Sequence, residues 1–183
     1  MSVSTYVTQT QNQPAIKVFL IGMMGSGKTF WAERLKKKLK VPAYDLDYLI
    51  ELMDERSIAE MFEQSGEEYF RKEEAKMLRL FKEKKQFILS CGGGTPCFSD
   101  NMNWMNKNGI TIWLDEPLAI LAERLDREKV HRPLIKNIKS SELIGFLSQK
   151  LTERLTYYQQ SQHRLTNLQI TESNLLKIIK QHA

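Results

Sequence analysis

The sequence predicts an α/β protein built on a parallel β-sheet with helices on both of its faces. Short continuous apolar runs, such as residues 16–21 (IKVFLI) and 86–90 (QFILS), are typical of strands that are buried on both faces. Longer segments rich in helix-forming residues separate these runs. Strands that alternate with helices indicate a parallel sheet, because parallel strands need a crossover connection.

The composition fits a single domain. The chain has 183 residues, of which 42% are hydrophobic and 27% are charged, an ordinary balance for a globular protein. Residues 1–14 are rich in Ser, Thr and Gln, so we expect a disordered segment ahead of one domain at 15–183. This segment lacks the features of a secretory signal, and no apolar run approaches the roughly 20 residues that span a bilayer. We therefore expect a cytoplasmic protein that binds no membrane.

The net charge and the cysteine content limit the kinds of ligand and site that the protein can have. The net charge of +5 suits anionic small ligands or a nucleic acid. A nucleic-acid-dependent ATPase would interleave basic and aromatic residues along a groove, and the sequence has no such stripe, so we expect no nucleic-acid partner. The two cysteines, Cys91 and Cys97, are too few for a disulfide framework, and their spacing is not that of a zinc site.

In the first half of the chain, Gly22 ends the first expected strand. Ser57 and Glu60 have the S-x-x-E spacing of a capping box and should open a helix that Gly66 ends. Apolar runs and helix-forming composition predict the other elements here: a helix at 28–40, a strand at 41–45 and a helix at 67–84.

In the second half, Pro117 suits a first helical turn and predicts a helix over residues 118–126. The same patterns predict the remaining elements: strands at 86–90, 110–114 and 164–170, and helices at 140–160 and 172–181.

Residues 22–29 (GMMGSGKT) match the phosphate-binding pattern G-x-x-x-x-G-K-[ST] between an expected strand and an expected helix. Glycines let successive backbone N–H groups turn toward an anion, and the helix offers its positive end to phosphate. Lys28 should reach the outer phosphates, and the Thr29 hydroxyl should bind Mg²⁺. The residues expected to bind the nucleotide are Gly22, Gly25, Ser26, Gly27, Lys28 and Thr29.

Other residues concern the acceptor of the phosphoryl group. Asp45 and Asp47 follow the second expected strand, at the edge of the sheet where ligands bind in such folds. One carboxylate could hold metal-bound water and the other could accept a hydrogen bond from a substrate hydroxyl, while either could also cap a helix. Arg71, Arg132 and Arg154 become candidates only if the fold brings them together, since a lone arginine is most often a surface charge.

The ordered set of motifs resembles shikimate kinase from about residue 16 to the end of the chain. The set comprises the phosphate loop, D-x-D at 45–47, G-E-x-x-F-R at 66–71, the triple glycine at 92–94 and R-P-L at 132–134. The resemblance implies a five-stranded parallel sheet of the P-loop NTPase, nucleoside-monophosphate-kinase-like type. It also implies a substrate-binding section at about 46–75 and a mobile lid at about 124–138.

The resemblance further implies a reaction. ATP and Mg²⁺ would serve to phosphorylate the 3-hydroxyl of shikimate, a step of aromatic amino-acid biosynthesis. Asp47 would orient that hydroxyl, and Asp45 would help Thr29 to organise Mg²⁺. Arg71 and Arg154 would bind the carboxylate of the acceptor, because a guanidinium pairs with a carboxylate through two parallel hydrogen bonds.

The resemblance assigns the remaining residues as well. Arg132 would enter with the lid and, with Lys28, stabilise charge on the transferring group, and Arg124 would lie against adenine. The glycines at 92–94, Gly92, Gly93 and Gly94, would form a wall of the acceptor pocket, since a main chain without side chains can approach a small ring. Cys91 and Cys97 would then be small residues at the edge of the core, and His131 an exposed lid residue.

Two alternatives stay open. Gluconate is also an anionic polyol, so a gluconate kinase of the same fold is the nearest rival. An ATP-binding module without transferase activity is the other, although Lys28, Thr29, Asp47 and Arg132 argue against it. We expect a monomer, because the sequence indicates no large apolar surface.

Overall fold

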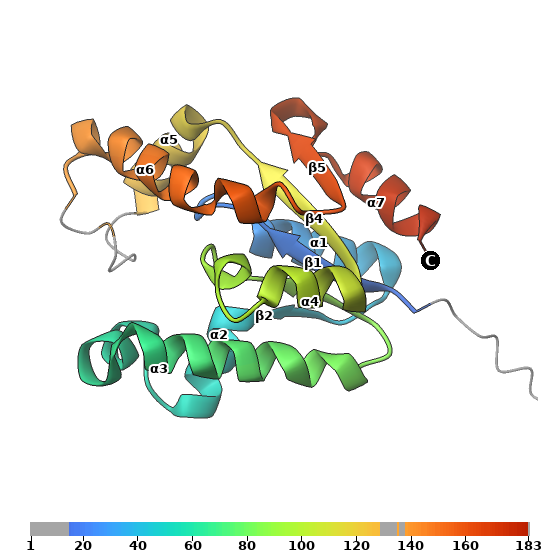
Figure 1. The fold of residues 1–183 in the computed structure, drawn as a ribbon. Coiled ribbons are helices and arrows are strands. Elements are labelled where there is room, and N and C mark those ends of the chain that lie inside the picture. The colour runs from blue at the N-terminus through green and yellow to red at the C-terminus, as the bar shows by residue number, and fades with distance from the viewer. Residues whose placement is uncertain (1–14, 129–134, 136–137, 183) are drawn as a thin grey trace, which may run out of the picture.

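The computed structural model describes residues 15–128, 135 and 138–182. Their five strands form one parallel sheet in the order β2-β3-β1-β4-β5 (Figure 1). The strands are β1 (Lys17–Ile21), β2 (Ala43–Asp45), β3 (Phe87–Ser90), β4 (Ile110–Asp115) and β5 (His163–Thr166). The predicted five-stranded parallel sheet is confirmed.

Helices cover both faces of this sheet (Figure 1). The α-helices are α1 (Lys28–Leu39), α2 (Leu46–Asp54), α3 (Ile58–Leu80), α4 (Asn101–Asn108), α5 (Leu118–Glu128), α6 (Ser140–Tyr158) and α7 (Glu172–Gln181). The described ranges also contain short 3₁₀ turns, among them η1 (Phe81–Glu83), η2 (Thr95–Cys97) and η5 (Asn167–Gln169).

Strand β1 shows how one buried run serves two cores. Its side chains alternate between the faces, so Phe19 and Ile21 join the core under α2 to α6, while Val18 and Leu20 join the core under α1 and α7. All four side chains are fully buried. A strand segment that faces apolar packing on both sides has to be apolar at every position, which explains the unbroken apolar run from Val18 to Ile21 after the partly buried Lys17.

Most predicted boundaries hold to within a few residues, and the differences are local. The strand expected at 164–170 ends at Thr166 and continues as η5. The helix expected to reach residue 84 stops at Leu80 and tightens into η1. Helices α2 and α4 were not predicted. Residues 1–14, on which the expected disordered segment falls, lie outside the described residues.

Helix α3 contains the predicted cap and a break. The Ser57 hydroxyl accepts from the Glu60 N–H at 3.2 Å, and the Glu60 carboxylate accepts from the Ser57 N–H at 2.7 Å, which confirms the capping box. Gly66 interrupts the helix with φ 81° and ψ 171°, a conformation open almost only to glycine. A Cβ added at Gly66 would meet nothing within 4 Å.

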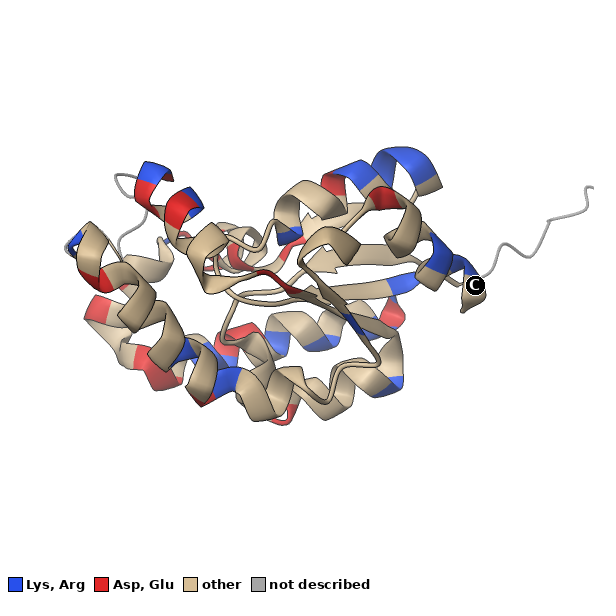
Figure 2. Cartoon of the chain, turned by 90° about the horizontal axis from the view of Figure 1, so that it is seen from above, with Lys and Arg blue, Asp and Glu red and all other residues tan. Residues whose placement is uncertain are grey.

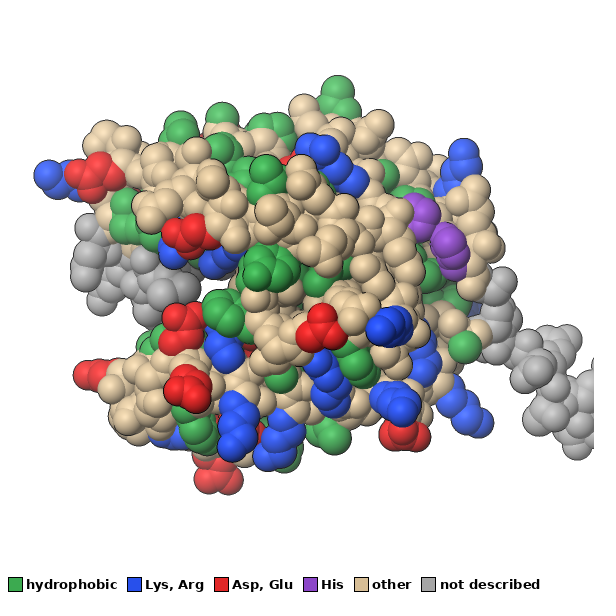
Figure 3. Space-filling view, viewed as in Figure 1, with side chains coloured by type: hydrophobic (Ala, Val, Ile, Leu, Met, Phe, Trp, Pro, Cys, Tyr) green, Lys and Arg blue, Asp and Glu red, His purple; other side chains and the backbone are tan. Residues whose placement is uncertain are grey.

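Charged side chains of both signs are interspersed over the helices (Figure 2). The space-filling view shows the same mixture on one face, with hydrophobic side chains scattered among the charges (Figure 3). Within residues 15–128, 135 and 138–182, no helix combines the length and the apolar content that a membrane span requires.

Candidate active site

The carboxyl ends of the parallel strands open into a cleft of about 860 Å³. Its lining includes Lys28 and Thr29 from the phosphate loop, and Asp45 and Asp47 from the end of β2 and the start of α2. Gly92 and Gly93, which follow β3, line it as well. These nucleotide and acceptor residues therefore meet at one edge of the sheet, where ligands bind in open parallel sheets. Arg71 and Arg154 are not part of this lining.

The phosphate loop needs its glycines for their backbone conformation. Gly22, Gly25 and Gly27 all have positive φ, and a Cβ at Gly22 would lie 2.6 Å from the carbonyl oxygen of Leu114. Gly27 caps the start of α1, whose first N–H groups are left for an anion. The ammonium group of Lys28 donates to the carbonyl oxygens of Gly22 and Met23 at 3.0 and 2.9 Å. The loop is thus shaped to receive phosphate, as its sequence predicts.

Ser26 lies inside the same loop. Its side chain is fully buried, and its hydroxyl makes no hydrogen bond with any of the described residues. Its N–H donates to the Met23 carbonyl oxygen at 3.2 Å. Ser26 therefore contributes to the turn of the loop from within.

Thr29 and Asp45 lie together, as the predicted metal site requires. The Thr29 hydroxyl donates to the Asp45 carboxylate at 2.7 Å and lies 3.2 Å from the Ser90 hydroxyl. Asp45 also caps α2, because it accepts from the N–H of Tyr48 at 3.3 Å, so the interpretation of Asp45 as a helix cap is confirmed. A hydroxyl and a carboxylate beside a phosphate loop fit Mg²⁺, which prefers oxygen ligands. The described residues contain no cluster of three or more His, Cys, Asp and Glu side chains, so phosphate and water would have to supply the other ligands.

The triple glycine contacts three predicted acceptor residues, one at each position. A Cβ at Gly92 would lie 2.7 Å from an Asp47 carboxylate oxygen, and one at Gly93 would lie 2.8 Å from an Arg154 guanidinium nitrogen. One at Gly94 would lie 2.7 Å from a guanidinium nitrogen of Arg71. Side chains do not approach a Cβ so closely. Glycine is therefore required at all three positions if the carboxylate and the two guanidinium groups are to pack against this main chain.

Asp47 has a strongly perturbed acidity. Its pKa is raised from 3.8 to about 7, first by burial and then by the nearby carboxylates of Asp45 and Glu74, while Lys28 and Arg71 oppose the rise. A carboxylate with a pKa near neutrality is suited to accept a proton and is typical of active sites.

Arg71 is fixed from several sides. Its guanidinium lies 2.9 Å from the Glu74 carboxylate and 3.0 Å from that of Glu67, and it stacks on the Phe98 ring at 4.0 Å. Glu74 is fully buried and also accepts from the Thr95 hydroxyl at 2.6 Å. Glu74 was not predicted as a site residue, although its position three residues after Arg71 on a helix places the two side chains on one face.

Arg154 approaches the site from α6. It contacts the Met23 sulfur at 3.7 Å, and Tyr158, one turn further along the helix, donates to the Gly93 carbonyl oxygen at 2.6 Å. The sequence analysis did not single out Tyr158 or Met23. An aromatic residue within the apolar pattern of a helix looks like any other core residue, so the sequence does not mark Tyr158 as part of a site.

Arg124 on α5 lies beside the phosphate loop. Its guanidinium donates to the Gly25 carbonyl oxygen at 3.1 Å and to the Glu116 carboxylate at 2.9 Å, and it lines the cleft. Arg132 and His131 lie outside the described residues, as does most of the expected lid.

The two cysteines are free thiols. Cys91 is buried in the core and Cys97 is partly buried. Burial raises the pKa of both thiols, that of Cys97 to about 11, so neither is a thiolate at neutral pH. Tyr48 is mostly exposed, at 62%.

A family model for shikimate kinase matches residues 24–182. The chain belongs to the shikimate kinase family. A shikimate kinase from Bacteroides fragilis is 39% identical to it over 148 residues, which make up 81% of this chain and 83% of the relative.

Solved shikimate kinases have the same architecture. The crystal structure of the enzyme from Bacteroides thetaiotaomicron is 35% identical, with a TM-score of 0.83 over 91% of this chain and 97% of that one. A shikimate kinase from Acinetobacter baumannii in complex with shikimate is 25% identical, with a TM-score of 0.76 over 91% of this chain and 89% of that one. The predicted family and fold are confirmed, and shikimate kinase membership implies the use of ATP.

Proposed function

We propose that this chain transfers the terminal phosphoryl group of ATP to the 3-hydroxyl of shikimate, giving ADP and shikimate 3-phosphate. Shikimate kinase activity, a step of the shikimate pathway, follows from the family. The observation that supports the roles of individual residues is the contact of Asp47, Arg71 and Arg154 with three successive glycines beside the phosphate loop.

At the nucleotide side of the cleft, the N–H groups of the loop and of the α1 N-terminus bind the phosphates, and Lys28 supplies a positive charge. Thr29 and Asp45 would hold Mg²⁺, with water completing the contact to Asp45. When bound, Mg²⁺ neutralises charge on the phosphate oxygens. Arg124 borders the nucleotide end of the cleft, and Arg132 completes the site from the proposed lid at about 124–138, as the family resemblance implies.

At the acceptor side, the proposed section at about 46–75 supplies Asp47 and Arg71. Arg71 and Arg154 bind the shikimate carboxylate, and Asp47 orients the reacting hydroxyl and accepts its proton. The glycine wall lets the ring approach the main chain. Phosphoryl transfer needs little covalent chemistry from a protein, so position and charge carry the catalysis. A monomer in the cytoplasm that binds neither nucleic acid nor a membrane stays a prediction.

One assay tests this function. ADP release is measured with shikimate, quinate, gluconate, nucleoside monophosphates or water as the acceptor, and the product is located by NMR. Among these acceptors, we expect only shikimate to support ADP release, and we expect the product to carry its phosphate on the 3-hydroxyl. A preference for gluconate would support the rival kinase, and equal release with water would remove the kinase assignment. Lys28→Ala should lower the rate by more than about tenfold, whereas the exposed Lys37→Ala on the same helix should not.

A further inference from the structure

Met23 contacts a cationic group on each side of the active site. Its carbonyl oxygen accepts from the ammonium group of Lys28 at 2.9 Å, at the phosphate end. Its sulfur lies 3.7 Å from a guanidinium nitrogen of Arg154, at the acceptor end. The side chain is 3% exposed, so it sits within the packed interior between the two ends.

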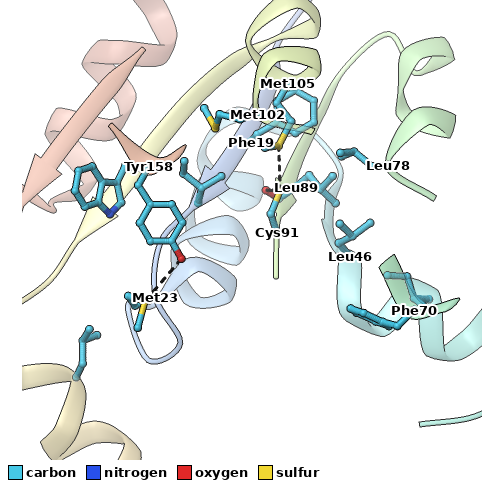
Figure 4. Close-up of a cluster of buried hydrophobic side chains, with 14 of the residues drawn as sticks. Phe19, Met23, Leu46, Phe70, Leu78, Leu89, Cys91, Met102, Met105 and Tyr158 are labelled. Carbon is cyan, nitrogen blue, oxygen red and sulfur yellow. Dashed lines mark hydrogen bonds between the residues drawn. The ribbon is translucent and has the colours of Figure 1, made fainter. Parts of the chain in front are cut away.

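Tyr158 closes this contact from α6. Its ring is fully buried, and its hydroxyl lies 3.8 Å from the Met23 sulfur and donates to the Gly93 carbonyl oxygen at 2.6 Å. Figure 4 shows the side chain of Tyr158 directed toward Met23. Arg154 and Tyr158 are one helical turn apart and lie on one face of α6. The glycine wall and Arg154 are therefore both held against the phosphate loop through Met23 and Tyr158.

We propose that Met23 is a positioning residue that couples nucleotide binding to acceptor binding by holding Arg154 in place. The inference rests on the proposed function, in which Lys28 binds phosphate and Arg154 binds the shikimate carboxylate.

Nucleotide and acceptor binding are coupled because phosphate orders the loop that contacts Arg154. Phosphate fixes the backbone of the loop around it, and with it the Met23 side chain. Arg154 then packs against a fixed sulfur, so the acceptor has less conformational freedom to remove when it binds. Because coupling free energies are reciprocal, shikimate should tighten nucleotide binding by the same factor.

The test measures the Kd of shikimate by calorimetry, without nucleotide and with saturating Mg²⁺ and a non-hydrolysable ATP analogue. We expect the analogue to lower the Kd of the wild-type protein by about fivefold or more. Met23→Leu keeps the volume but removes the sulfur acceptor, and it should reduce this factor to below about twofold. The Kd of the analogue alone should stay within about twofold of wild type, since the loop backbone is unchanged.

Two further variants complete the experiment. Tyr158→Phe should also reduce the coupling factor, because it releases Gly93 and one neighbour of the sulfur. Met102→Leu is the matched control, since Met102 is equally buried in the same core and should keep the full factor. An unchanged factor in both Met23→Leu and Tyr158→Phe, or no coupling in the wild type, would overturn the inference. A wild-type protein that binds no shikimate under either condition would reject the proposed function itself.

Discussion

The glycine wall yields the sharpest prediction, the effect of Gly94→Ala. Gly94 has φ −91° and ψ −16°, a conformation that alanine adopts without strain, so the change acts through contact alone. The new Cβ would lie 2.7, 3.0 and 3.1 Å from three guanidinium atoms of Arg71. The Arg71 guanidinium would have to recede by roughly 0.7 Å to reach ordinary contact.

Arg71 cannot recede freely, because Glu67, Glu74 and the Phe98 ring hold it. The displaced guanidinium should lose one of its two hydrogen bonds to the substrate carboxylate. A hydrogen bond between charged groups contributes about 1.5–3 kcal/mol. The KM for shikimate should therefore rise by between about tenfold and a hundredfold.

Steady-state ADP release with each substrate varied in turn measures this effect. The KM for ATP should stay within about twofold, because the nucleotide lacks the carboxylate that Arg71 binds. Gly145→Ala is the matched control. Gly145 lies in α6, and a Cβ added there would meet no atom within 4 Å. It should leave both KM values unchanged and stabilise the helix by about 0.5–1 kcal/mol. A folded Gly94→Ala protein with a wild-type KM for shikimate would refute the assignment of Arg71.

Four other perturbations test the site and its support. The pKa of about 7 for Asp47 predicts that kcat/KM falls about tenfold per pH unit below pH 7, and a flat profile from pH 5.5 to 8 would contradict its role as base. Because the raised pKa makes the ionised form destabilising above pH 7, Asp47→Asn should raise Tm at pH 8 and lose this advantage as the pH falls toward 4. Glu74→Ala leaves Arg71 without its buried partner and should lower the free energy of unfolding by about 3–5 kcal/mol in urea titrations; a loss below about 1 kcal/mol would contradict this. Ser57→Ala removes the capping box and should cost about 1 kcal/mol while leaving kcat unchanged, and altered turnover would tie this cap to the site.

Continuous apolar runs and local turn chemistry were sufficient to predict the sheet and most helices. Strands β1, β3 and β4 are buried on both faces, so their sequences leave little choice of structure. Helix α4 (NMNWMNKN) gave no such signal, because half of its residues are asparagine, which favours turns. Burial of Met102 and Met105 in the core accompanies the helical conformation there. Tertiary contacts override local preference at this point.

The residues of the candidate site also fall into two groups, those that the sequence could identify and those that it could not. Residues within a fixed spacing, such as Lys28 and Thr29, could be named from the sequence, because one loop sets their geometry. Glu74 and Phe98 could not, because each looks like a common surface charge or core ring until the fold places it against Arg71. What decides their importance is burial beside a cation, which no local pattern encodes.

Gly66 has a consequence of its own for chemical synthesis. A Cβ added at Gly66 meets no atom beyond its chain neighbours within 4 Å, so the backbone conformation, and not space, disfavours an L-residue here. Its backbone angles of 81° and 171° mirror those of an ordinary extended L-residue. A synthetic chain with D-alanine at this position should fold more stably than the natural one, whereas the L-alanine enantiomer should weaken it.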